Sequence, residues 1–372
     1  MSKPRMITST DVAREAGVSR ATVSAVLNGT QGNIRVSDET HRRVRAVAAA
    51  LGYSPHPVAR ALRQQRSRMI AFVPRTMHAT EYGHPIAYQL SLHTDRAAAR
   101  LGYHVIEVNT EESATDHDEG LIDFLLSRRP DGVIFDAPTT PHAVEAMVAR
   151  GIPAVQLMRP QFAVATPTII VDAAQGVTDA VDHLVALGHR RIAYLGSDDP
   201  HVANRSRLAC FRAVLARHGI PAPAEYIALG PEYTAEQGAA LTWRVLRCSP
   251  PPTALFSGAD TFAVGALHAL HQARIRVPDA ISLVSYDDVY AAMLCPPVTS
   301  VAQPLREVAE RAVALIVAAI EEGADSAQPP IRIVLPTGLH IRASTWPPSE
   351  ELVLVSLVAD RSMDRPEETG RK

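Results

Sequence analysis

The stretch Thr8–Asn28, TSTDVAREAGVSRATVSAVLN, predicts two short helices joined by a tight turn. Thr8 or Ser9 can cap the first helix, because a side-chain oxygen there can accept from the first free backbone amides. Gly17 can end that helix, and Ser19 can cap the second. Two helices around so short a turn are typical of a helix-turn-helix, which places its second helix in the major groove of DNA.

A third helix is predicted from Ser37 to about Leu51, with Gly52 to end it. Two short helices cannot close a hydrophobic core alone. The third helix would therefore complete a small all-α headpiece.

This segment resembles the start of the LacI/GalR family of bacterial repressors, whose pattern DVAxxAGVSxxTVSxVLN is met at almost every position. The resemblance implies that three residues of the second helix face base edges: Arg20, Ala21 and Ala25. An arginine can bond bidentately to guanine, whereas alanine can at most touch a thymine methyl group. The resemblance also implies contacts to the DNA backbone from a second set: Ser19, Thr22, Ser24 and Asn28. A phosphate contact for Arg20, in place of base readout, stays open.

The sequence YSPHPVARAL, residues 53–62, resembles the hinge of the same family, YxPNxxAxxL, with His56 in place of asparagine. A helix this short is not stable alone. The resemblance implies that it folds when two copies meet over the minor groove, with Leu62 wedged into a base step and Ala59 packed beside it. Packing of Leu62 on the following domain is the alternative.

Charge is divided unevenly along the chain. Residues 1–68 contain twelve Lys and Arg against four Asp and Glu, a net charge of +8. The remaining residues contain 25 Lys and Arg against 35 Asp and Glu, a net charge of −10. A basic head on an acidic body is expected when one small domain contacts phosphate groups.

The chain has 372 residues, 47% hydrophobic and 20% charged, as expected for two or three folded domains. No apolar run approaches ~18 residues and there is no secretory signal, so we expect a cytoplasmic protein without a membrane span. Three cysteines without CxxC spacing predict free thiols in cores, and no metal or cofactor is expected: Cys210, Cys248 and Cys295.

From Met69 onward, short apolar runs alternate with amphipathic stretches. A first series of predicted strands covers residues 70–74, 104–108, 132–135, 154–157 and 168–171. A second series covers residues 191–196, 226–230, 253–258 and 281–287. Continuous apolar strands separated by helices predict an α/β core of two doubly wound parallel-sheet subdomains. No phosphate-binding glycine motif follows these strands, and ligands of such folds bind outside the carboxyl ends of the strands.

The core also resembles that of the LacI/GalR family, which is itself similar to periplasmic binding proteins. The resemblance is firmest at LGHRRIAYLG (187–196), RLACF (207–211), ISLVSYDD (281–288) and PPVTSVAQPL (296–305). We expect a helix-turn-helix headpiece at 1–54, a hinge helix and linker at 55–68, and an effector-binding and dimerisation core at 69–345. The N-subdomain would cover about 69–172 and 303–330, and the C-subdomain about 173–300 and 331–345, with three strand-like crossings between them. Residues 346–372 are predicted to be a disordered tail, in which the apolar segment 352–358 has no assigned role.

In the core, the resemblance implies a ligand-binding pair. Arg207, in RLACF, would donate to sugar hydroxyls or carboxylates, and Asp287, in YDD, would accept from hydroxyls. Tyr233 would stack on the ligand, and Gln303 and Asp260 are further candidates. A structural ion pair is the alternative for Arg207 and Asp287.

Three departures from the family pattern make the predicted pocket less polar. Ala259 stands in place of an asparagine, Met158 in place of the commoner aspartate, and residues 74–87 form a longer loop. A ligand with fewer hydroxyls, or a larger and partly apolar one, is compatible with these changes, as is the loss of effector control.

Together these features predict a dimeric DNA-binding transcriptional regulator, more specifically a repressor, that binds a near-palindromic operator. A small molecule, a sugar or a related metabolite, would modulate its affinity for operator DNA. No HExxH, GxSxG or paired metal-ligand spacing points to an enzyme. A small-molecule-binding protein without DNA activity and an architectural DNA binder without an effector are the other classes.

Overall fold

The computed structural model describes residues 7–28, 36–53, 66–75, 85–108, 117–136, 140–158, 164–198, 202–323 and 330–349. The chain divides into two compact units, residues 1–69 with 128–131 and residues 70–127 with 132–372. The predicted hinge residues Ala59 and Leu62, and the tail segment 352–358, lie outside the described residues.

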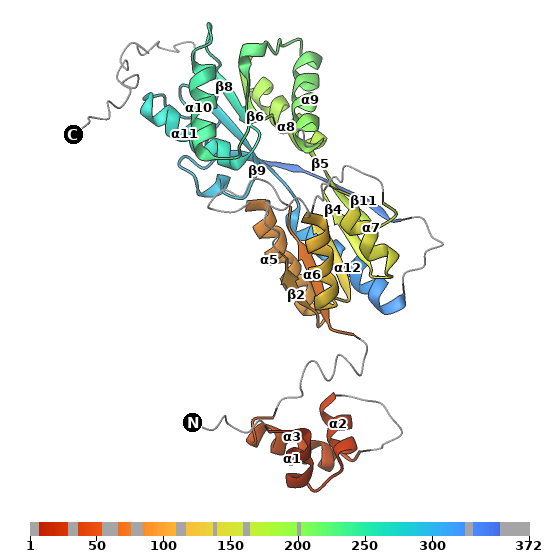
Figure 1. Ribbon diagram of the computed structural model, residues 1–372. Coiled ribbons are helices and arrows are strands. Elements are labelled where there is room, and N and C mark those ends of the chain that lie inside the picture. The colour runs from red at the N-terminus through yellow and green to blue at the C-terminus, as the bar shows by residue number, and fades with distance from the viewer. Residues whose placement is uncertain are drawn as a thin grey trace, which may run out of the picture. The chain divides into compact units, whose positions relative to one another are not determined.

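The headpiece contains the three predicted helices, α1 (Ser9–Glu15), α2 (Arg20–Asn28) and α3 (Asp38–Ala50) (Figure 1). Thr8 caps α1, because its hydroxyl accepts from the Asp11 amide at 3.4 Å while the Asp11 carboxylate accepts from the Thr8 amide at 3.0 Å. Ser37 caps α3 by accepting from the amide of Thr40.

Buried residues from all three helices form the headpiece core: Val12, Ala13, Ala16, Val23, Val26, Val44 and Ala48. Gly17, with φ of +65°, turns the chain between α1 and α2 in a conformation that favours glycine. The next amide, that of Val18, donates to the carbonyl of Ala13 at 3.0 Å. The tight turn predicted from the sequence is therefore confirmed.

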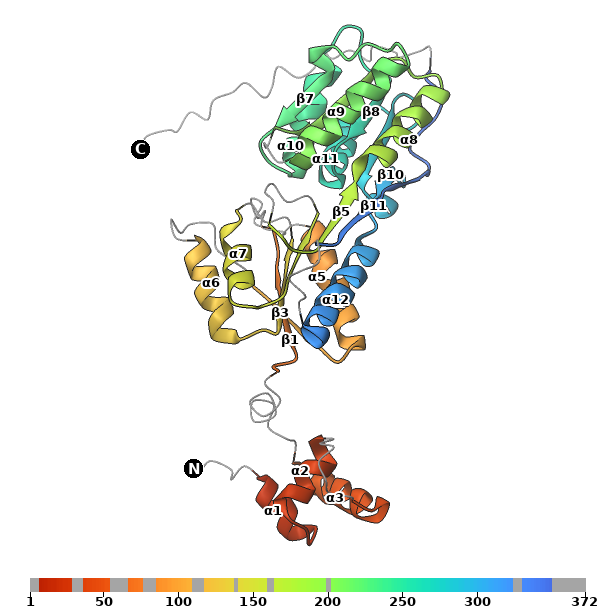
Figure 2. The same cartoon turned by 90° about the vertical axis from the view of Figure 1, so that its right-hand side faces the viewer.

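The first sheet has six strands in the order β11–β5–β4–β3–β1–β2. These strands are β1 (Met69–Val73), β2 (His104–Glu107), β3 (Gly132–Asp136), β4 (Ala154–Leu157), β5 (Thr168–Asp172) and β11 (Arg332–Pro336). Neighbours pair in parallel from β1 through β3, β4 and β5 to β11. Figure 2 shows α5 (Pro85–Arg100) and α12 (Leu305–Glu322) on one face of the sheet, and α6 (His117–Arg128) and α7 (His142–Ala149) on the other. The sheet is covered on both sides, which explains its continuous apolar strands.

The second sheet has the strand order β12–β10–β9–β8–β6–β7. These strands are β6 (Ile192–Ser197), β7 (Ile227–Gly230), β8 (Ala254–Ser257), β9 (Ser282–Asp287), β10 (Thr299–Ala302) and β12 (Gly338–His340). Only β12, paired with β10, is antiparallel among the described pairings of this sheet. α8 (Ala173–Ala186) and α9 (Val202–Arg217) pack on one face, and α10 (Ala235–Leu246) and α11 (Asp260–Gln272) on the other (Figure 1).

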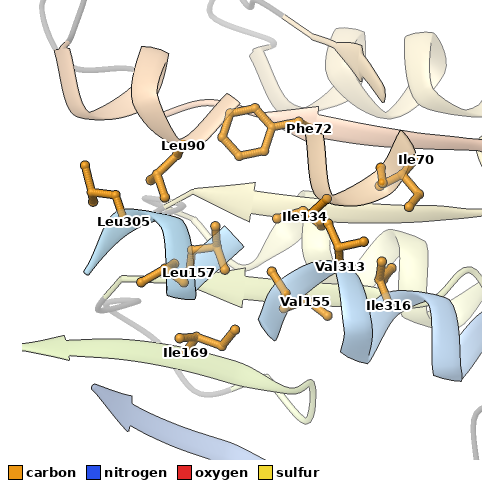
Figure 3. Close-up of a cluster of buried hydrophobic side chains, with 14 of the residues drawn as sticks. Ile70, Phe72, Leu90, Ile134, Val155, Leu157, Ile169, Leu305, Val313 and Ile316 are labelled. Carbon is orange, nitrogen blue, oxygen red and sulfur yellow. The ribbon is translucent and has the colours of Figure 1, made fainter. Parts of the chain in front are cut away.

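A fully buried hydrophobic cluster joins α5 and α12 to the first sheet (Figure 3). Leu90 of α5 and Val313 and Ile316 of α12 lie beside Phe72 of β1 and Ile134 of β3, all with no exposed surface. Burying a side chain of this size is worth about 1.5–3 kcal/mol. Because α12 follows β10 of the second sheet, this packing helps to hold the two sheets in one unit.

The chain crosses between the two sheets three times, as predicted: from β5 to α8, from β10 to α12, and from β11 to β12. At the last crossing, the Thr337 hydroxyl donates to the carbonyl of Asp172 at 3.0 Å and accepts from the amide of Gly176 at 3.0 Å. The prediction that 331–345 belong to the C-subdomain is wrong for β11, which pairs with β5 in the first sheet. Its Leu335 is buried in the hydrophobic cluster of that sheet.

Trp346, the first residue of the predicted disordered tail, is instead bonded to the core. Its amide donates to the hydroxyl of Ser282 at 3.0 Å, and its carbonyl oxygen lies 2.9 Å from Nε2 of His189. The His189 ring is buried, with Nδ1 2.9 Å from the hydroxyl of Thr253. A tail boundary at residue 346 is therefore wrong, because these bonds fix the backbone there. Burial lowers the pKa of His189 to about 4.

We expect the His189→Gln variant to lose part of the acid sensitivity of the wild type. The His189 pKa is about 4 in the folded protein against an ordinary 6.5. As the pH falls below 6.5, the unfolded chain takes up a proton that the folded protein does not accept until about pH 4. This difference lowers the wild-type free energy of unfolding by roughly 1–3 kcal/mol between pH 7 and pH 4.

Urea unfolding at a series of pH values measures the effect. The matched control is His268→Gln, at an exposed position on α11, which should keep the wild-type pH dependence. An equal pH dependence for His189→Gln and the wild type would contradict the assignment.

Candidate DNA interface and effector site

α2 presents an exposed face opposite its buried valines. Arg20 and Ala21 are exposed, whereas Ala25 is half-buried between Val23 and Val26 along the helix. Two of the three predicted base-reading positions are thus open to a DNA groove, and Ala25 offers only part of a methyl group. The functional groups available for hydrogen-bonded base readout at these positions come from Arg20.

The N-terminus of α2 is capped by Ser19, whose hydroxyl accepts from the Thr22 amide at 3.0 Å and lies 2.9 Å from the Thr22 hydroxyl. Both hydroxyls lie at the positive end of the helix dipole, where a phosphate oxygen is stabilised. Ser24 is half-buried, and Asn28 is the last residue of α2. The residues predicted to contact the DNA backbone therefore extend along α2 from its capping residue, Ser19, to its last residue, Asn28.

Cationic side chains surround this helix pair. Five arginines of the described headpiece are exposed: Arg14, Arg20, Arg42, Arg43 and Arg45. Nε of Arg43 donates to the carbonyl of Ala16 at 3.1 Å, which fixes α3 against the end of α1. The positive charge that the sequence places in the headpiece is thus at the surface, as contacts with phosphate require.

In the core, Arg207 of α9 is buried, with 8% of its surface exposed. Its Cζ lies 3.9 Å from the centre of the Tyr286 ring, and its Nη1 donates to the carbonyl of Gly258. Its Nε has no hydrogen-bond partner, and no ion pair joins Arg207 to a carboxylate among the described residues. The alternative of a structural ion pair with Asp287 is therefore not observed. A buried donor without a partner costs about 1–3 kcal/mol.

Asp287 ends β9 in a left-handed conformation, with φ of 106°, and Asp288 follows with φ of 59°. Non-glycine residues held in this region are strained and cluster at functional sites. Oδ1 of Asp287 accepts from Nε2 of Gln303 at 2.7 Å, whereas Asp288 accepts from Arg342 at 2.6 and 2.9 Å. The Asp287 carboxylate is therefore bonded to another predicted ligand-binding residue, Gln303, whereas the Asp288 carboxylate forms an ion pair with Arg342.

Burial raises the pKa of Asp287 to about 7. The positive charges of Arg207 and Arg75 act in the opposite direction, and the negative charge of Asp260 adds to the increase. Near neutral pH, the Asp287 carboxyl group is therefore a donor in part of the molecules and an acceptor in the rest.

Asp260, a predicted ligand-binding residue, is 2% exposed and bonded to the protein through both oxygens. Oδ2 accepts from the amides of Val289, Tyr290 and Ala291 at 2.6, 2.8 and 3.3 Å, and Oδ1 accepts from the hydroxyl of Ser285 at 2.5 Å. These bonds support a role in holding the segment after Asp287, with no oxygen left for a ligand.

Two residues at the carboxyl ends of the first sheet were not predicted. Arg75 follows β1, and its Nε and Nη2 donate to Asp136 at the end of β3, at 3.0 and 2.8 Å. Asp136 is buried and the Arg75 side chain is 12% exposed. The charge of Arg75 acts on Asp287 of the second sheet. A charged residue directly after an apolar parallel strand, as in VPR and VIFD, was the signal that could have found them.

Three further predicted ligand-binding residues are Tyr233, Ala259 and Met158. Tyr233 is half-buried and stacks on Phe262, with ring centres 5.1 Å apart. Ala259 caps α11 without a side-chain bond. Met158 follows β4, is buried and has φ of 62°. Five of the predicted residues thus lie in the C-subdomain, and Gln303 lies at the crossing from β10 to α12. Met158 lies in the N-subdomain, where the polar groups come from Arg75 and Asp136.

The three cysteines are free thiols, and Cys295 is exposed, so the expectation that all three fill cores is wrong for Cys295. Within the described ranges, no three His, Cys, Asp or Glu side chains are grouped so that they could hold a metal ion. No helix of the described part of the chain has both the length and the apolar character needed to cross a membrane.

The chain combines a helix-turn-helix headpiece with two mainly parallel sheets, and charged side chains lie at the carboxyl ends of their strands. This combination defines a class of DNA-binding regulators. The signature of bacterial regulatory proteins of the lacI family matches residues 8–56, and that of the periplasmic binding protein-like domain matches residues 181–345. The HTH-type transcriptional regulator DegA of Bacillus subtilis (strain 168) is 30% identical over 343 residues, which is 91% of this chain and 97% of that protein.

Two solved structures have the same architecture. The lac repressor dimer bound to operator and the anti-inducer ONPF superposes with a TM-score of 0.77 at 28% identity, over 92% of this chain and all of that one. The complex of the transcriptional regulator CelR with cellobiose gives a TM-score of 0.66 at 27% identity, over 91% of this chain and all of that one. The chain belongs to the LacI family of bacterial regulatory proteins and is a DNA-binding transcriptional regulator.

Proposed function

We propose that this regulator is a repressor that binds a near-palindromic operator as a dimer, with an affinity that a small molecule in the core modulates. Its place of action is the cytoplasm, where operator DNA lies, and it performs no catalysis. Two features of one chain support the proposal. Arg20 lies on the exposed face of α2, and in the described part of the core the buried Nε of Arg207 has no hydrogen-bond partner.

Binding as a dimer to two half-sites is supported by the small number of base-reading groups in one headpiece. One headpiece with alanine at positions 21 and 25 has few groups for base readout, so two half-sites are needed for specificity. The lac repressor structure is a dimer on operator DNA, which supports the same arrangement here. The hinge prediction, with Leu62 as the minor-groove wedge and Ala59 beside it, is part of this proposal.

The control of operator affinity is assigned to the two subdomains of the core. A ligand between Arg75 and Asp287 would contact both sheets at once, and the three crossings allow their relative angle to change. Coupling between such sites is typically ~1–3 kcal/mol, or ~5–150-fold in affinity. The CelR complex contains cellobiose, which supports a small carbohydrate-like effector.

We expect Arg20→Ala to relax the base preference at one position of each half-site. Loss of a bidentate contact to guanine costs about 1–3 kcal/mol at that position and little elsewhere. Selection of bound sequences from a random DNA pool, for both proteins at one salt concentration, measures the change. Arg42→Ala, which removes an exposed arginine of α3, is the control and should weaken binding evenly across sequences. An even loss for Arg20→Ala would mark it as a phosphate contact.

A further inference from the structure

We propose that the effector is an organic acid, a small polyhydroxylated molecule whose carboxylate bonds to Arg207 of the C-subdomain and Arg75 of the N-subdomain. The inference rests on the proposed function, because it names the ligand class of the same core site. It goes further in specifying the charge of the ligand and a contact from Arg75, which neither the motifs nor the relatives assign.

The first step is the state of Arg207. A guanidinium that is 8% exposed would ordinarily be neutralised by a carboxylate, since a buried unpaired charge is unfavourable. Here one face is covered by the Tyr286 ring and Nη1 bonds to the Gly258 carbonyl, but Nε has no partner and no ion pair forms among the described residues. An anionic ligand oxygen supplies the missing acceptor for Nε and the direct charge contact that Asp287, which acts on Arg207 without forming an ion pair, does not provide.

The second step is a second guanidinium on the other sheet. Asp136 accepts from Nε and Nη2 of Arg75, and within the described part of the chain Nη1 of Arg75 makes no hydrogen bond. The bidentate pair holds the Arg75 side chain in one orientation beyond the carboxyl end of β1. Val289, two residues after Asp287, packs against the hydrophobic cluster of the first sheet, so the segment after β9 lies against that sheet. The charge of Arg75 accordingly acts on Asp287 and Tyr233. A ligand held between the sheets can therefore meet cationic groups from both sides.

The third step is the balance of negative charge. Met158 follows the residue that pairs with Asp136. Its thioether carries no charge, so Met158 neither repels a bound anion nor offers a strong acceptor to the hydroxyls of a neutral sugar. Ala259 likewise has no side-chain polar group to offer to hydroxyls. Asp136 and Asp287 remain, so a singly charged carboxylate fits this site better than a phosphate dianion.

The test compares acids with their neutral parents. We would measure the thermal shift and the titration calorimetry of the full-length protein with D-gluconate and D-glucuronate against D-glucose, and with D-galacturonate against D-galactose. D-glucose 6-phosphate separates phosphate from carboxylate. The expected result is binding of at least one acid, at least tenfold tighter than its parent and than the phosphate. Preference for a neutral sugar, preference for the phosphate, or no binding of any acid would overturn the inference.

Variants identify the residues involved. Arg207→Gln and Arg75→Gln remove a charge and keep an amide donor, so each should weaken acid binding by about 10- to 150-fold. Arg205→Gln, at an exposed position on the same helix as Arg207, is the matched control and should bind the acid as the wild type does. Arg207→Lys keeps the charge and should retain more acid affinity than Arg207→Gln. Unchanged acid binding in Arg75→Gln would overturn the contact from the N-subdomain.

The pH dependence of affinity separates the ligand classes independently. Asp287 is faced by charged or polar groups from each neighbouring element: Arg207, Asp260, Gln303, Arg75 and the adjacent Asp288 with its partner Arg342. Ionisation of Asp287, whose pKa is about 7, places a negative charge beside a bound carboxylate. Acid affinity should therefore fall by up to about tenfold per pH unit above pH 7, whereas a neutral polyol that donates to Asp287 would bind more tightly.

Operator binding in the same samples distinguishes the two possible failures. If a neutral sugar binds and changes the affinity for selected operator DNA, the acid inference is wrong and the proposed function stands. If the protein binds no specific DNA sequence, the proposed function fails whatever the ligand is.

Discussion

Replacing Asp260 by alanine should lower the free energy of unfolding of the core by about 3–5 kcal/mol. The Asp260 carboxylate accepts from three consecutive amides and from Ser285, all in or near buried positions. Alanine would leave these donors without an acceptor in the protein. The segment after Asp287 would also lose its anchor, so we expect a weaker response to the effector.

Both tryptophans, the half-buried Trp243 and the exposed Trp346, belong to the second unit of the chain, so urea unfolding followed by tryptophan fluorescence reports on that unit. Asp279→Ala is the matched control. It removes a carboxylate from an exposed pair with Arg276, and should change the free energy of unfolding by less than about 0.5 kcal/mol. An Asp260→Ala variant within about 1 kcal/mol of the wild type would show that the segment does not depend on this carboxylate.

Gly265→Ala should destabilise the core by about 2–4 kcal/mol, although helix propensity alone predicts a gain of about 1 kcal/mol. Gly265 lies where α11 meets α10, and an added methyl group would overlap the carbonyl oxygen of Ala235 and crowd the amide of Ala239. These atoms belong to a helix backbone and cannot rotate away. Gly238 of α10 faces Phe262 across the same contact in the same way.

Gly120→Ala provides the control for Gly265→Ala. Gly120 lies within α6, and an added methyl group there meets nothing within 4 Å. Propensity then acts alone, and the variant should be more stable by about 0.5–1 kcal/mol. We therefore expect the free energy of unfolding to fall in Gly265→Ala and to rise in Gly120→Ala. A stabilised Gly265→Ala would mean that α10 and α11 can separate at little cost.

Local patterns predicted the elements of the fold well, because they are encoded in adjacent residues. Caps such as Ser37 and apolar runs such as the one at 132–135 place helices and strands within about two residues of their positions. The destination of β11 was not predicted, because pairing with β5 depends on residues more than 150 positions away. The bonds that hold Trp346 to Ser282 are non-local in the same way.

Residues of the candidate site were predictable where a motif carries them and hidden where only the fold brings them together. Arg207 and Asp287 stand in recognisable segments, whereas Arg75 and Asp136 are 61 positions apart and meet because β1 and β3 are neighbours. Asp260 stood in a recognisable segment too, yet its bonding to the amides after Asp287 was visible only in three dimensions.

Effector-controlled operator binding is tested by selecting DNA from a random pool with the full-length protein and then measuring binding to the selected sequence with and without effector. We expect one enriched, near-palindromic sequence with two half-sites, to which the protein binds as a dimer, and an affinity that changes by ~5–150-fold when the effector is added. Enrichment of no sequence, with binding that depends only on salt concentration, would contradict this expectation.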